Sequence, residues 1–170
     1  MINNKEDLEN FVTNNWDKIN LYIDNMQSEL VMPIYTSVDI RESNTRFAPV
    51  DNNLYPAGFN NICALDLNVC SDRLKNAVLH FKSDAKRVAI IPESHTKNKF
   101  YLDHLHTLNS ILVKHFQTVD IISPDHEMFE QAQAENSLNS NGELPLVSHS
   151  GHALTIKPVK QIGAKLVNQQ

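Results

Sequence analysis

Glycine is scarce in this sequence, with only four among 170 residues: Gly58, Gly142, Gly151 and Gly163. Loops that cradle a phosphate need several glycines close together, because the backbone N–H groups must approach the anion. The four glycines fit neither the GxGxxG fingerprint nor the GxxxxGK[ST] loop, and no GxSxG nucleophile elbow occurs. A complete nucleotide-hydrolysing site within this chain alone is therefore not expected.

Cysteine is equally scarce, and its spacing argues against a zinc site. Cys63 and Cys70 lie seven residues apart, without a CxxC motif or a zinc-type Cys/His spacing. The first residues, MINNKEDLEN, are acidic and polar, which is not the pattern of a secretory signal. A disulfide is conceivable, but in the reducing cytoplasm that we expect for this chain, buried free thiols are the better interpretation.

The chain also lacks excess positive charge and long apolar runs. It holds 15 Lys and Arg against 20 Asp and Glu, for a net charge of −5. No basic stripe indicates nucleic acid binding, and no run approaches the roughly 18 apolar residues of a membrane span. With 41% hydrophobic residues and no repeat or long linker, residues 1–170 are predicted to form a single globular domain.

The centre of the chain predicts a compact βαβ unit. Residues 87–91 are a short, nearly all-apolar strand, and residues 118–122 form another. Between them, a helix is expected over about residues 97–115, with apolar side chains on one stripe. Such a crossover places the two strands parallel and is normally right-handed.

The flanking segments complete an α/β pattern. The predicted fold is a mainly parallel sheet with flanking helices and a C-terminal β-hairpin. Residues 131–142 are polar and are expected to form a mobile loop. The other expected elements are a helix over 6–30, a strand over 34–40, a helix from Asp66 or Ser71 to Phe81, hairpin strands over 144–147 and 153–156, and a short helix over 159–167.

Residues 46–62, RFAPVDNNLYPAGFNNI, match neither a helix nor a strand period. Prolines and the Pro-Ala-Gly turn break regular structure, whereas Asn and Asp bond their own backbone. Phe47, Leu54, Tyr55 and Phe59 would anchor such a loop. We therefore predict a long, ordered loop that presents amides and a carboxylate to a ligand.

Two loops qualify as a candidate site, because open α/β sheets bind ligands at the carboxyl ends of their strands. Arginine forks suit carboxylate or phosphate, and a helix N-terminus favours anions. As alternatives, the arginines could pair with Asp39, Glu42 or Asp51, and Ser94 or Thr96 could simply cap the helix with Glu93 near its dipole. The candidate residues, expected to meet in space, are Arg41, Arg46, Asp51, Asn52, Asn60 and Asn61 in the first loop, and Glu93, His95, Thr96 and Asn98 in the second.

The histidine pairs do not predict a metal site. His104 and His106, two apart on a helix, would point about 200° away from each other. His149 and His152 flank a turn, and no third ligand is identified for them. All four are predicted to be surface residues.

Three motifs in order resemble one known family. Asp39-Ile-Arg41, then PVDNNLYPAGFNN at 49–61, then IPESHTKNKFY at 91–101 are similar to the N-terminal portion of the proteobacterial-type glutamate–cysteine ligases. The resemblance covers about residues 33–125, and Lys97 stands where the family usually has Arg. It implies a Rossmann-like fold of the pre-ATP-grasp type, and ATP- and Mg²⁺-dependent joining of glutamate to cysteine, the first step of glutathione synthesis.

Family members are several hundred residues long, and their ATP-grasp-like half would follow Gln170. The resemblance therefore implies that this chain supplies a substrate-side domain for glutamate or cysteine and is incomplete, or truncated, as a catalyst. Its partners would be the missing ATP-grasp-like part or a second copy in a homo-oligomer. The alternatives are a non-catalytic binding module for a small carboxylate or amino acid, and an inactive remnant.

Overall fold

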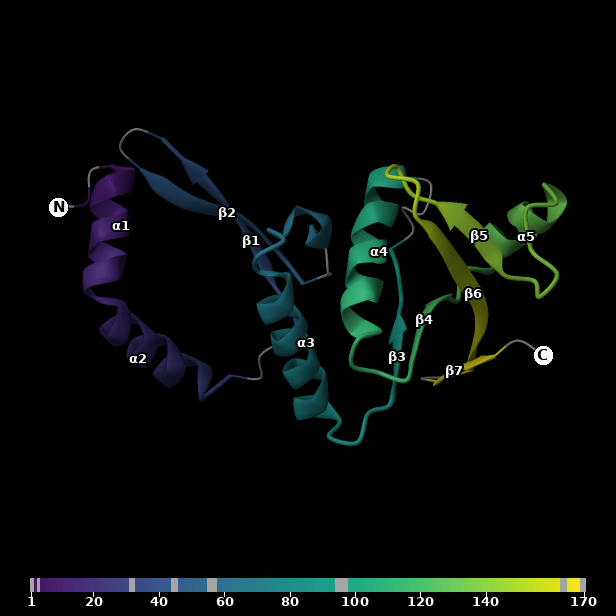
Figure 1. Cartoon of the computed structure of the whole chain (residues 1–170), viewed down its shortest axis with the longest axis horizontal. Helices are drawn as coiled ribbons and strands as arrows, with labels where there is room; N and C mark the ends of the chain where they lie inside the picture. Colours follow the sequence, from purple (N-terminus) through teal and green to yellow (C-terminus); the bar gives the residue numbers. More distant parts are fainter. Residues whose placement is uncertain are drawn as a thin grey trace. The chain divides into compact units, whose positions relative to one another are not determined.

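The computed structural model describes residues 2, 4–30, 33–43, 46–54, 58–93, 98–162 and 165–168. The chain divides into two compact units, Met1–Pro56 and Ala57–Gln170. Figure 1 shows the first in purple to blue and the second in teal to yellow. Each is described by itself, and the single domain expected from the sequence stays a prediction.

The first unit contains two helices, α1 (Lys5–Asn14) and α2 (Trp16–Gln27). The single helix predicted over 6–30 is therefore wrong in one respect, since it breaks at Asn15. The Asn15 side chain donates to the carbonyl oxygen of Phe11 at 2.8 Å, which satisfies a carbonyl at the end of α1. At the start of α1, Asn4 Oδ1 accepts the Asp7 N–H at 2.9 Å as an N-cap.

An antiparallel ribbon completes the first unit and corrects the interpretation of residues 46–62. Strand β1 (Ser37–Glu42) pairs with β2 (Phe47–Asn53), so seven of the seventeen residues of the predicted loop form a strand. The register shifts between Asp39 and Ile40, opposite Pro49 and Asp51, and both strands are edges, where proline is tolerated. No described residue of this unit is buried. Strand β2 therefore has no buried face, and its sequence does not alternate between apolar and polar residues.

The second unit is built on a mainly parallel sheet. Its order is β3-β4-β6-β5, with β7 pairing β6. Strands β3, β4 and β6 are parallel, whereas β5 and β7 run antiparallel to β6. The elements are η1 (Phe59–Asn61), α3 (Leu67–Phe81), β3 (Arg87–Ile90), α4 (Lys99–Leu112), β4 (Thr118–Ser123), α5 (His126–Ala134), β5 (Leu144–Val147), β6 (Ala153–Ile162) and β7 (Lys165–Asn168).

The predicted α/β class, the parallel βαβ unit and the C-terminal hairpin are confirmed. Helix α4 packs against α3 and against β4, β5 and β6, so it lies between a helix and the sheet (Figure 1). Its stripe of Leu105, Leu108 and Leu112 is buried, together with Phe116 beyond its end and Ile156 of the sheet. Among the described elements, this helix contributes the largest share of the hydrophobic core of the second unit, through Leu102, Leu105, Leu108, Ile111 and Leu112.

Two predictions about the C-terminal third are wrong. Residues 131–134 belong to α5 rather than to a mobile loop, and Asp125 Oδ1 caps that helix by accepting the Met128 N–H at 3.1 Å. The tail predicted as a short helix forms the end of β6 and β7, whose pairing satisfies its backbone groups. No helix within the described residues is long and apolar enough to cross a membrane.

Candidate functional site

In the second unit, three aromatic side chains join parts of both candidate loops to α4. The Phe59 N–H donates to His104 Nδ1 at 3.2 Å, and the two rings lie 5.6 Å apart. The Tyr101 ring lies 5.4 Å from that of His104, and the Tyr101 hydroxyl accepts the Glu93 N–H at 2.8 Å. We call Phe59, Tyr101 and His104 the aromatic cluster.

The aromatic cluster places the two amides of the first loop. Gly58, with a φ of 74°, starts the turn, and the Asn61 N–H donates to its carbonyl at 2.9 Å. Phe59 points inward with only 3% of its surface exposed, whereas Asn60 and Asn61 are exposed. The turn therefore has a buried anchor and presents two amide side chains to solvent.

His104 is buried, with 2% of its surface exposed, so its prediction as a surface residue is wrong. Leu102, Asp103 and Leu105 are buried as well, because α4 is covered on more than one face. One signal in the sequence was missed. His104 lies three residues after Tyr101 and four before Leu108, and this spacing puts it on the apolar stripe.

The second loop is only partly described. His95 and Thr96, with Ser94 and Lys97, lie outside the described residues. Asn98 caps α4, since its Oδ1 accepts the Phe100 N–H at 3.0 Å. The N-cap position therefore belongs to Asn98, and the alternative that Ser94 or Thr96 fills it is wrong.

The remaining candidates lie on the ribbon of the first unit. Arg41, Arg46, Asp51 and Asn52 are all exposed there. Within the described part of the chain, neither arginine forms an ion pair with Asp39, Glu42 or Asp51, so the alternative of loop staples is not supported.

Two ribbon side chains have local partners instead: Asn52 Oδ1 accepts from Thr36, and Asp51 Oδ2 accepts from Asn53 at 3.2 Å. The ribbon follows an antiparallel pairing, so the rule for parallel strand ends does not apply to it. Whether these residues meet the second loop stays a prediction.

Cysteine and metal chemistry are limited in the described residues. Cys63 and Cys70 are free thiols. Cys63 is exposed rather than buried as predicted, and partial burial raises the pKa of Cys70. No three His, Cys, Asp or Glu residues gather to hold a metal ion within the described ranges.

The turn between β5 and β6 is fastened to α4. The His149 and His152 side chains are exposed, as predicted, and stack on Phe100 at 4.1 Å and on His106 at 3.8 Å. The Ser148 hydroxyl, and then the Ser150 N–H, hold the pKa of the buried Asp103 carboxyl below its usual range. Burial, and then the charge of His152, lower the pKa of His106.

Acidification is expected to weaken the second unit through His106. When the pKa of a histidine is lower in the folded chain than in the unfolded chain, the histidine favours the fold at a pH above its unfolded pKa of about 6.5. This contribution is lost as the pH falls through its folded pKa. The thermal unfolding midpoint should therefore decrease when the pH is lowered from 7.5 to 5.5. His106→Phe keeps a stacking ring without a titrating proton, so its midpoint should fall less over that range.

The matched control is His80→Gln, on the exposed face of α3. It should show the same pH dependence as the unmodified chain. An identical pH dependence in His106→Phe and the unmodified chain would assign the acid sensitivity to other groups.

Comparisons with known proteins bear on the whole chain. A family model described as glutamate-cysteine ligase matches residues 9–169. The crystal structure of a "Putative gamma-glutamylcysteine synthetase" from Methylobacillus flagellatus KT is similar, with a TM-score of 0.78 and 33% sequence identity. The match covers 95% of this chain and 35% of that protein, so the chain spans about a third of that relative. No functionally curated protein matches.

Proposed function

Because the chain belongs to the glutamate-cysteine ligase family, we propose that it supplies the N-terminal, substrate-side part of a γ-glutamylcysteine-forming enzyme. The observation that carries this assignment is the hydrogen bond from Phe59 to His104. This bond holds η1, with the exposed amides of Asn60 and Asn61, against helix α4. The second candidate loop leads directly into the first turn of that helix. Both segments belong to the motifs by which the sequence resembles the family.

The chemistry of the proposed site is recognition of a carboxylate. In the second unit, Asn60 and Asn61 present N–H donors that suit a carboxylate. Arg41 and Arg46 of the first unit carry exposed guanidinium groups that suit bidentate contact with a carboxylate, and their part in binding stays a prediction of its own. In such a reaction ATP would transfer its γ-phosphoryl group to the side-chain carboxylate of glutamate, releasing ADP, and the amine of cysteine would then displace phosphate to form the amide bond. The role proposed for this chain is to bind and orient an amino acid for that step.

ATP and Mg²⁺ belong to the proposed whole enzyme. Within the described residues, no group of three metal-ligating side chains gathers. We assign nucleotide and metal binding to an ATP-grasp-like part outside the described residues. We further propose a cytoplasmic setting, because both described cysteines are free thiols.

The test measures the binding of L-glutamate and of L-cysteine to this chain by isothermal titration calorimetry. Asn61→Ala is expected to weaken the binding of one of them about tenfold, the effect of losing one hydrogen bond to a charged group. Its thermal unfolding midpoint should change little, because Asn61 is exposed and its backbone turn is retained.

Asn68→Ala, an exposed asparagine of α3, is the matched control and should leave both affinities unchanged. The absence of any glutamate or cysteine binding, or equal losses in the two variants, would overturn the assignment. ADP release by this chain alone, dependent on both amino acids, would instead place the nucleotide site within it.

A further inference from the structure

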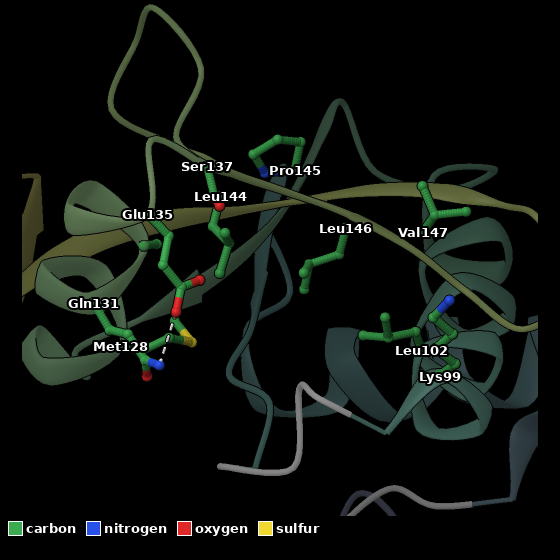
Figure 2. Close-up of a pocket in the computed structure, with 11 residues that line it drawn as sticks. Lys99, Leu102, Met128, Gln131, Glu135, Ser137, Leu144, Pro145, Leu146 and Val147 are labelled. Atoms are coloured by element: carbon green, nitrogen blue, oxygen red, sulfur yellow. Dashed lines mark hydrogen bonds between the residues drawn. The ribbon is translucent and has the colours of Figure 1, made fainter.

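A pocket with a volume of about 420 Å³ lies in the second unit, apart from the aromatic cluster. Figure 2 shows residues that line it, from the first turn of α4, from α5 and the residues after it, and from strand β5. Its size is at the lower end of that of small-molecule sites. None of the residues proposed for glutamate or cysteine lines it.

The pocket carries opposite charges at its two ends. Lys99 lies at one end and Glu135 at the other, with Leu102, Met128 and Leu146 between them (Figure 2). Neither charged side chain forms an ion pair within the part of the chain that the structure describes. Glu135 Oε1 accepts from Gln131 at 3.0 Å, which orients the carboxylate.

The wall formed by β5 is the open edge of a sheet. Strand β5 ends the order β3-β4-β6-β5, and all four of its residues line the pocket. The Ser148 N–H donates to the His152 carbonyl, and hydrogen-bonded pairs alternate along antiparallel strands. Pro145 and Val147 therefore direct their backbone groups away from β6, and Val147 offers an N–H and a carbonyl at this edge.

The wall is held in place before any ligand arrives. The His149 N–H donates to the Lys99 carbonyl at 3.0 Å, and the Ser150 N–H donates to Asp103 Oδ1 at 3.2 Å. These bonds fix the end of β5 beside the first turn of α4. A pre-formed site loses less conformational entropy on binding.

We propose that this pocket binds a short zwitterionic peptide with apolar side chains, of two or three residues. In a single α-amino acid, the ammonium and the carboxylate are both attached to the α-carbon. Lys99 and Glu135, by contrast, are separated by the apolar side chains that line the middle of the pocket. An extended peptide separates its termini by roughly 3.3–3.6 Å per residue. Its carboxylate would meet Lys99, its ammonium Glu135, and its backbone the edge of β5.

The direction of the peptide follows from the labelled residues. Leu144, at the start of β5, lies on the Glu135 side of the pocket, and Val147, at its end, lies on the Lys99 side (Figure 2). The bound peptide therefore runs parallel to β5. Its apolar side chains pack against Leu102, Met128 and Leu146.

The experiment titrates the whole chain with L-leucyl-L-leucine and follows backbone amide shifts by NMR. Shifts are expected at Leu144–Val147 and in the first turn of α4. Lys99→Met and Glu135→Gln should each weaken binding about five- to tenfold. The controls Lys114→Met and Glu130→Gln, exposed and outside the pocket, should leave it unchanged.

Capped peptides assign each end. Acetylation of the amine should remove the sensitivity to Glu135→Gln, and amidation of the carboxylate should remove that to Lys99→Met. No shifts at millimolar peptide, or equal affinity for free and doubly capped peptides, would overturn the inference. Displacement of the peptide by L-glutamate would also overturn it as a separate site, while leaving the proposed function standing.

Discussion

Replacing Phe59 with alanine is expected to lower the free energy of unfolding of the second unit by about 3–5 kcal/mol. Phe59 is 3% exposed, and its ring lies 5.6 Å from that of the buried His104. Truncation would leave a cavity between η1 and α4, because the surrounding side chains relax only partly. Urea unfolding followed by circular dichroism measures the loss.

The same change should reduce amino-acid binding, since Asn60 and Asn61 are held by the turn that Phe59 anchors. The matched control is Leu54→Ala, another apolar residue of the stretch from 46 to 62. Leu54 is 62% exposed, so its removal should change stability by no more than about 0.5 kcal/mol. Comparable losses in both variants would show that Phe59 is not the specific anchor of this turn.

The elements predicted best were those whose local pattern and burial agree. Strand β3 is a short apolar run, and helix α4 has a single apolar stripe. The hairpin of β5 and β6 has a short polar turn between its two strands. Local pattern failed where pairing is set by distant backbone groups. Strand β2 carries Asp51 and consecutive asparagines with no buried face, so only its pairing with β1 marks it as a strand.

The candidate site shows the same division. The sequence motifs led to Asn60, Asn61 and Asn98, and Phe59 was correctly predicted as a buried anchor. His104 was missed because histidine is polar and usually half-exposed, and its burial depends on η1 packing over α4. Leu54 was predicted as an anchor from its apolar character alone, yet it is mostly exposed.

The pocket could not have been derived from the sequence. Its lining residues come from 99–102, 128–137 and 144–147, and residues 131–137 of the middle segment fall in the stretch 131–142 that was predicted to be a mobile loop. Only the packing of α5 beside β5 places Glu135 opposite Lys99 (Figure 2). A single sequence carries no periodic signal that places opposite charges at the ends of two separate helices opposite each other.

Ile156→Ala is expected to lower the free energy of unfolding by about 2–5 kcal/mol. Ile156 has no exposed surface and lies at the junction of the sheet, opposite Ile121 of β4 and Leu144 of β5. It is therefore packed by the parallel core on one side and by the wall of the pocket on the other. Native-state amide exchange should show faster opening of β5 together with β6.

The comparison variant is Ile40→Ala in the ribbon, where the side chain is 69% exposed and a change of at most about 0.5 kcal/mol is expected. Both substitutions remove the same atoms from a strand. The difference between their changes in unfolding free energy therefore reports the effect of burial, separate from that of β-propensity. If Ile156→Ala unfolds only β5, the edge strand opens independently of the parallel sheet. If β4, β5 and β6 lose protection together, the pocket wall and the core form one cooperative unit, because a single buried side chain joins them.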